Sequence, residues 1–138
     1  MSRLVIATLA ALAGEALLAG SASATAGMVC EALDGSGASV EMNLPRAAGT
    51  PPNWVRVTTS DRTFSSLSID EGAIPIQTRQ SFDGGDTFFI DLTDADQSDA
   101  VIRIRLLRAE EGDEMPVYIG YLHVVGEGIY PITCTEDE

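Results

Sequence analysis

The sequence predicts an all-β protein, a single small antiparallel β-sandwich or barrel of about eight strands whose ends are tied by one disulfide. Apolar residues recur at every second position in several short runs, which is the period of a strand with one buried face. Clusters of glycine, proline, asparagine and aspartate separate these runs roughly every eight to twelve residues. After the N-terminal leader, no segment carries a helical apolar stripe of useful length, so we expect no helix in the folded domain.

Residues 1–26 have the features of a secretory signal peptide. A positive charge at Arg3 precedes an apolar run, and small residues then form two A-x-A triplets. We expect cleavage after Ala24 or Ala26, which makes residues 27–138 a single β domain. Glu15 interrupts the apolar run, which is shorter than the roughly 20 residues of a membrane-spanning helix. We therefore predict export to the periplasm or beyond the cell, with no membrane span in the mature chain.

The two cysteines, Cys30 and Cys134, lie near the two ends of the mature domain. In an exported protein, a single pair of this kind is most simply a disulfide. We therefore predict a bridge between the first and the last strand. Two distant cysteines and one histidine are too few ligands for a metal site, and we expect no cofactor.

Each predicted strand has an apolar face. Ile102, Ile104 and Leu106 share one side of their strand, whereas Arg103 and Arg105 share the other, as an antiparallel sheet with one wet side requires. After the strand that contains Cys30, the predicted strands are, in chain order, Val40–Leu44, Trp54–Thr59, Phe64–Ile69, Ile74–Gln80, Phe88–Leu92, Ile102–Leu106, Val117–Val125 and Ile129–Cys134.

The last two runs form the clearest predicted hairpin. Gly126-Glu127-Gly128 joins them as a three-residue turn in which glycine can adopt a positive φ. Pro131 lacks a backbone donor, so we expect the final strand to be an edge strand or to present its proline position to solvent.

The aspartate-rich stretch from Asp83 to Asp99 is the nearest approach to a metal motif. A helix-loop-helix calcium loop needs glycine at its sixth position and glutamate at its twelfth, and no register of this stretch supplies both. Aspartate also caps turns through its own backbone, and we favour that interpretation. A weak cation site is the alternative, with Asp91, Asp94, Asp96 and Asp99 as its ligands.

Two connections are candidate binding loops. Pro51 and Pro52 lead into Trp54, although a tryptophan in so small a domain is more often part of the core. The stretch from Ala109 to Pro116 carries four acids, which could meet a basic partner or form a solvated hairpin loop.

No catalytic constellation is evident. His123 is the sole histidine and lies in a strand beside apolar neighbours, and no serine resembles a nucleophile elbow. We predict that the protein is not an enzyme and keep an unrecognised hydrolase as an alternative.

The formal net charge is −13, and every positive charge is an arginine. Loss of the leader removes one arginine and one glutamate, so the mature charge is the same. Such a surface repels nucleic acid and anionic membranes and attracts cationic partners. We predict a binding module for a basic protein. A structural or assembly component of the cell envelope is the main alternative.

The pattern Tyr118-x-Gly120-x-Leu122 followed by Tyr130-Pro131-x-x-Cys134, with Cys30 near the mature start, resembles small exported bacterial proteins of unknown function. The opening from Cys30 to Gly35 is similar to that of periplasmic lysozyme inhibitors, which are small disulfide-linked β-barrels. The Ser-Gly-x-x-Tyr segment that carries inhibition in that family has no counterpart here, so the resemblance implies a fold and not an activity.

Overall fold

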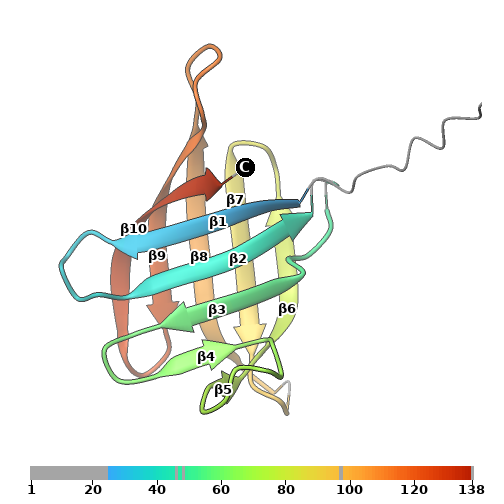
Figure 1. Ribbon diagram of the computed structural model, residues 1–138, viewed down its shortest axis with the longest axis vertical. Helices are drawn as coiled ribbons and strands as arrows, with labels where there is room; N and C mark the ends of the chain where they lie inside the picture. The colour runs from blue at the N-terminus through green and yellow to red at the C-terminus, as the bar shows by residue number, and fades with distance from the viewer. Residues whose placement is uncertain (1–24, 46, 48, 97, 138) are drawn as a thin grey trace, which may run out of the picture.

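The structure is a computed structural model that describes residues 25–45, 47, 49–96 and 98–137 (Figure 1). These residues form β-strands and turns, and no helix occurs among them. The predicted leader falls outside the described residues except for Thr25 and Ala26, which begin the first strand. The prediction of an all-β fold is therefore confirmed.

The chain forms ten strands. They are β1 (Thr25–Ala32), β2 (Ser39–Pro45), β3 (Trp54–Thr58), β4 (Thr63–Ser65), β5 (Ile74–Pro75), β6 (Gln77–Asp83), β7 (Thr87–Thr93), β8 (Ala100–Ala109), β9 (Val117–Val124) and β10 (Gly128–Asp137).

All ten strands belong to one sheet, in the order β5-β4-β3-β2-β1-β10-β9-β8-β7-β6. Neighbouring strands are antiparallel except β4 and β5, which are parallel. Figure 1 shows β1, β2 and β3 lying across the direction of β7, β8 and β9, with the sheet curled round between them. The result is a nearly closed, barrel-like sheet whose inner face surrounds the core.

The chain passes from one edge of the sheet to the other at a single residue, Ile76. β5 ends at Pro75 on one edge, and β6 begins at Gln77 on the opposite edge. Ile76 is buried, and its amide donates to the carbonyl of Ser65 (3.0 Å). The run Ile74–Gln80, predicted as one strand, is therefore two strands. This split is one reason why the sheet has ten strands and not about eight.

The alternation predicted from the sequence sets the inner face of the sheet. Ile102, Ile104 and Leu106 of β8 are fully buried, while Arg103 and Arg105 lie on the outer face. Burial of each such leucine or isoleucine side chain stabilises the fold by about 1.5–3 kcal/mol. The other core side chains come from the same alternation in neighbouring strands, and the largest that are fully buried are Met28, Val40, Met42, Val55, Val57, Ile90, Leu92, Leu122 and Ile132.

The hairpin between β9 and β10 differs by one residue from the prediction. Val124 pairs with Gly128, so the turn is Val125-Gly126-Glu127, and Gly126 adopts the positive φ (80°). Of the two alternatives predicted for the final strand, the edge strand is wrong, because β10 lies between β1 and β9, whereas Pro131 is exposed, as the other alternative expected.

Pro131 is tolerated in this central strand because of where β1 ends. The amide position and the carbonyl of one strand residue point the same way, and the Pro131 carbonyl accepts from Leu33, one residue beyond β1. The missing donor therefore falls past the end of the β1 ladder, where no strand carbonyl needs it.

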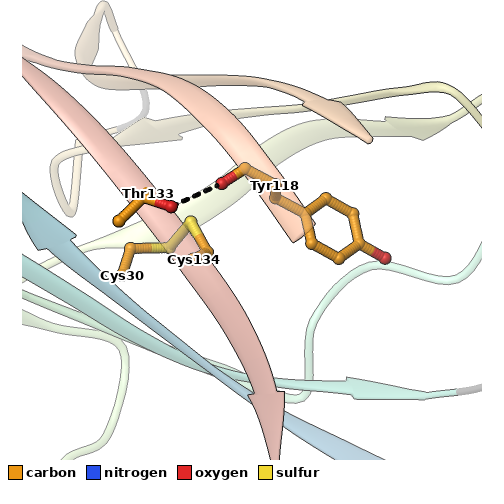
Figure 2. Close-up of a disulfide and its surroundings, with 4 residues drawn as sticks. All are labelled: Cys30, Tyr118, Thr133 and Cys134. Atoms are coloured by element: carbon orange, nitrogen blue, oxygen red, sulfur yellow. Dashed lines mark hydrogen bonds between the residues drawn. A yellow bond between two sulfur atoms is a disulfide. The ribbon is translucent and has the colours of Figure 1, made fainter. Parts of the chain in front are cut away.

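The predicted disulfide between Cys30 and Cys134 is confirmed (Figure 2). The two cysteines are direct cross-strand partners on β1 and β10, and both are fully buried. Beside them, the Thr133 hydroxyl donates to the Tyr118 carbonyl of β9 (3.2 Å). The bridge therefore joins the first and last strands in the interior of the barrel.

Gly120 marks a close approach of β9 to β8. A Cβ atom at this position would lie 1.8 Å from the Arg105 carbonyl oxygen. Real Cβ atoms do not come so near a backbone oxygen, so a residue with a side chain would push the two strands apart. Glycine therefore allows the curvature of the sheet at this point.

Candidate functional site

An apolar patch runs along the outer face of β9 and includes one residue each from β8 and β10. Its members, here called the outer patch, are Leu107, Val117, Ile119, Tyr121 and Ile129, and their exposed fractions range from 41% to 63%. Strand pairing connects these residues, because Leu107 lies opposite Ile119, and Val117 and Tyr121 flank Ile119 on β9. Ile129 lies opposite His123 and is therefore a diagonal neighbour of Tyr121. Contiguous apolar surface of this kind marks an interaction site more often than isolated exposed residues do.

Aromatic side chains extend this surface towards the edge of the sheet. Phe82 of β6 stacks on Phe89 of β7, with 5.0 Å between ring centroids. The Arg105 guanidinium lies 4.9 Å from the Phe89 centroid and donates to Asp91 (2.6 Å). Arg105 is also the cross-strand partner of Tyr121, so it connects the aromatic pair with the outer patch. Aromatic and arginine side chains are the residues that dominate binding energy at protein interfaces.

The connection between β8 and β9 places acids beside the outer patch. It leaves β8 at Ala109, two residues beyond Leu107, and enters β9 at Val117. Its exposed acids therefore lie near the patch, and they are Glu110, Glu111, Asp113 and Glu114. One basic residue faces this loop, since Arg108 pairs with Glu110 (2.7 Å). The loop therefore gives one end of the patch a negative rim.

The four aspartates predicted as a weak cation site are not brought together. Asp91 is 7% exposed, and its carboxylate accepts from Gln80 and Arg105, both at 2.6 Å. Asp96 and Asp99 lie exposed in the turn before β8, and Asp94 is half-buried. Within the described residues, no three acidic, histidine or cysteine side chains gather as a metal site would require. Asp83 makes the turn bond expected of aspartate, since its carboxylate accepts from the Gly85 amide (3.0 Å), whereas the Asp94 Oδ1 atom is buried and has no hydrogen-bond partner. The cation site and the turn interpretation of Asp94, Asp96 and Asp99 both stay predictions.

The proline-containing loop gives a mixed result. Pro51 is exposed, whereas Pro52 is buried. The expectation that Trp54 belongs to the core is wrong, because Val55 and Val57 take the inward positions of β3 and leave Trp54 half-buried on the outer face. The Arg56 guanidinium lies 5.9 Å from its ring centroid. Trp54 is thus a surface aromatic side chain, some strands away from the outer patch.

A polar network that the sequence did not reveal holds the segment between β4 and β5. Arg56 of β3 donates to both carboxylate oxygens of Asp70 (2.7 and 3.0 Å), and the Ser65 hydroxyl donates to the same group (2.5 Å). The hydrogen bonds from Arg56 and Ser65 lower the pKa of Asp70 below its ordinary value of 3.8. This network anchors a loop and offers no free ligand, so we interpret it as structural.

His123 lies on the outer face, where its strand neighbours are Arg103 on β8 and Ile129 on β10. It therefore borders the outer patch at the end away from the acidic loop.

Sequence reasoning missed the outer patch although a signal was present. The segment VYIGYLHVV is apolar at nearly every position, whereas a strand with one wet face alternates. Val117, Ile119 and Tyr121 are the surplus apolar residues, and they lie on the outside because Tyr118, Leu122 and Val124 take the inward positions.

Comparisons with family models, curated proteins and solved structures gave no match for this chain. The resemblances drawn from the sequence therefore stay predictions. The part of the chain that the structure describes holds no helix with the length and hydropathy of a membrane span. The fold and surface define an acidic all-β protein with one nearly closed ten-stranded sheet and an apolar outer face.

Proposed function

We propose that this chain is a non-catalytic, exported binding module whose outer patch binds a protein with an apolar surface flanked by basic residues. The observation that carries the proposal is the continuity of the outer patch across β8, β9 and β10. None of these outward side chains belongs to the buried core of the barrel. Their burial against a partner would recover about 25 cal/mol for each Å² of apolar surface removed from water.

The charge of the molecule supports a basic partner. The four acids of the β8–β9 connection adjoin the patch, and the chain carries a net charge of −13. A long-range negative potential speeds the encounter with a cationic protein and repels a second copy of the same chain. This repulsion favours a different protein as the occupant over self-association.

Export is part of the same proposal. Thr25 and Ala26 belong to β1, and Ala26 is buried and pairs with Leu44. Cleavage after Ala26 would remove this end of the strand, so we expect cleavage after Ala24. Intact-mass measurement of the exported protein distinguishes the two sites, and a mature chain that begins at Gly27 would contradict the expectation.

The test compares partner binding by patch and control variants. The oxidised mature domain is immobilised, a captured basic protein is identified, and its Kd is measured by calorimetry for each variant. We expect Leu107→Ser with Ile119→Ser to weaken binding at least tenfold. Ile69→Ser serves as the control, because Ile69 is apolar and even more exposed (79%) but lies between β4 and β5. Added salt should also weaken binding by screening the acidic rim.

Two outcomes would refute the proposal. The first is a Kd that the patch variant and the control variant change equally. The second is sedimentation of the wild-type domain as a dimer that the patch variant abolishes, which would favour the envelope-assembly alternative.

A further inference from the structure

A pocket of about 430 Å³ lies at one end of the barrel, here called the mouth pocket. Leu44, Phe88 and Ala26 line it with apolar surface, and Met115 and Pro116 of the β8–β9 connection form part of its rim. Its volume falls within the range of roughly 300–1,000 Å³ that is usual for ligand pockets, and the mouth of a β-barrel is a recurrent place for them.

The polar side of the mouth pocket comes from three adjacent strands. Arg108 of β8, Tyr118 of β9 and Glu136 of β10 all line it, and Asp83 of β6 contributes a further carboxylate. The Tyr118 hydroxyl donates to Glu136 (2.5 Å), which fixes this carboxylate in the pocket wall. Burial and the neighbouring Glu136 carboxylate raise the pKa of Tyr118 well above its ordinary value, so its hydroxyl remains a donor.

The charges in the mouth pocket favour a cation. Glu136 and Asp83 are both carboxylates, while the one guanidinium, that of Arg108, is already paired with Glu110 (2.7 Å). An ammonium group would therefore meet two carboxylates, of which Glu136 accepts from the Tyr118 hydroxyl and Asp83 from the Gly85 amide. An anionic ligand would meet the same two carboxylates at the cost of repulsion.

Arg108 adds a second requirement. Its Nε atom has no hydrogen-bond partner but is closed to solvent, whereas the side chain as a whole is 33% exposed and lines the pocket. Arginine carries five N–H donors, more than the Glu110 pair uses, so an acceptor in the pocket can bind to this guanidinium. A ligand with a carbonyl oxygen as well as an ammonium group would satisfy both sides of the pocket.

We propose that the mouth pocket binds a lysine residue of a peptide chain, with its ammonium group on Glu136 and Asp83, its methylene chain along Leu44 and Phe88, and its carbonyl oxygen on Arg108. A lysine residue combines the ammonium, apolar and carbonyl groups that this lining requires. The inference rests on the proposed function for the source of the lysine, a basic partner protein. The chemistry of the pocket can be tested without that partner.

The test is an NMR titration of the oxidised mature domain with N-acetyl-lysine methylamide. The matched probes are N-acetyl-norleucine methylamide, which lacks the ammonium group, and hexylammonium, which lacks the carbonyl group. We expect saturable shifts confined to residues of the mouth pocket, with the norleucine probe at least tenfold weaker and hexylammonium at least threefold weaker. Glu136→Gln should weaken the lysine probe at least fivefold, whereas Glu114→Gln removes an acid outside the pocket lining and should not.

Several results would overturn the proposal. Equal binding of the norleucine probe would remove the role of the carboxylates, and equal binding of hexylammonium would assign the site to free alkylamines. Shifts outside the pocket, or full binding by a folded Glu136→Gln variant, would refute the site itself. The wild-type domain could fail to bind the lysine probe while its partner binding still depends on the outer patch. That combination would refute this inference and leave the proposed function standing.

Discussion

Reduction of the Cys30–Cys134 disulfide should destabilise the domain more than any other chemical change that leaves the sequence intact. The bridge joins residues 104 positions apart, so it restricts nearly the whole unfolded chain. In the chain-entropy model, a loop of that size contributes about 4.7 kcal/mol at 25 °C. Domains have free energies of unfolding of about 5–15 kcal/mol, so reduction should remove a third of the stability or more.

The assay is urea unfolding of the oxidised and reduced domains, followed by tryptophan fluorescence from Trp54. With a slope of about 1.5 kcal/mol/M, the midpoint should fall by about 3 M. Reduction keeps both sulfur atoms in the core, so it separates the cross-link from packing, which a Cys30→Ala/Cys134→Ala variant does not. A midpoint shift below about 0.7 M would show that the unfolded chain gains little freedom on reduction, and the entropic argument would fail.

Three further predictions concern the sheet, acid stability and calcium. Gly120→Ala should lower the free energy of unfolding by on the order of 3 kcal/mol in urea unfolding, because the new Cβ atom would overlap the Arg105 carbonyl. Gly27→Ala is the control and should be nearly neutral, because its Cβ atom meets only ordinary contacts. Equal effects of the two substitutions would contradict the close approach of β9 to β8. Asp70 has a folded-state pKa below 3.8, so its contribution to stability is present above that pH and is lost as the pH falls through the folded-state pKa. The urea unfolding midpoint, measured from pH about 7 to about 2, should therefore fall less at acid pH in the Asp70→Asn variant than in the wild type. An equal fall in both proteins would count against this role of Asp70. Millimolar calcium at constant ionic strength should leave the melting temperature unchanged because Asp91 is already hydrogen-bonded, and a calcium-specific rise would revive the predicted cation site.

The strands could be predicted from the sequence because alternation is a local property. The spacing of two residues placed Ile102, Ile104 and Leu106 on one face of their strand, and all three are buried. The pairing of β1 with β10 was also predictable, because two cysteines in an exported domain imply that their strands meet. The passage from one edge of the sheet to the other at Ile76 could not be predicted, since the pattern on both sides of this residue is that of a strand. Only the positions of the neighbouring strands decide that β5 joins one edge and β6 the other.

The candidate surfaces were harder to predict because they depend on assembly. The core interpretation of Trp54 relied on its size, whereas the alternation of Val55 and Val57 already pointed it outward. The outer patch was hidden because an apolar run does not reveal which of its residues the barrel leaves uncovered. The mouth pocket combines Arg108, Tyr118 and Glu136 from three strands, so it exists only once the sheet has curled.

The passage of the chain across the sheet at Ile76 also determines where the barrel opens. Among the described residues, β6 pairs with β7 on one side and with no strand on the other. Most β6 side chains are exposed, so little packing holds this strand against the opposite edge. Its backbone amides should therefore exchange with deuterium before those of β9 and β10, which have neighbours on both sides. We therefore expect thermal opening of the cylinder to begin along one longitudinal seam, and the disulfide-linked wall opposite it to stay intact longest.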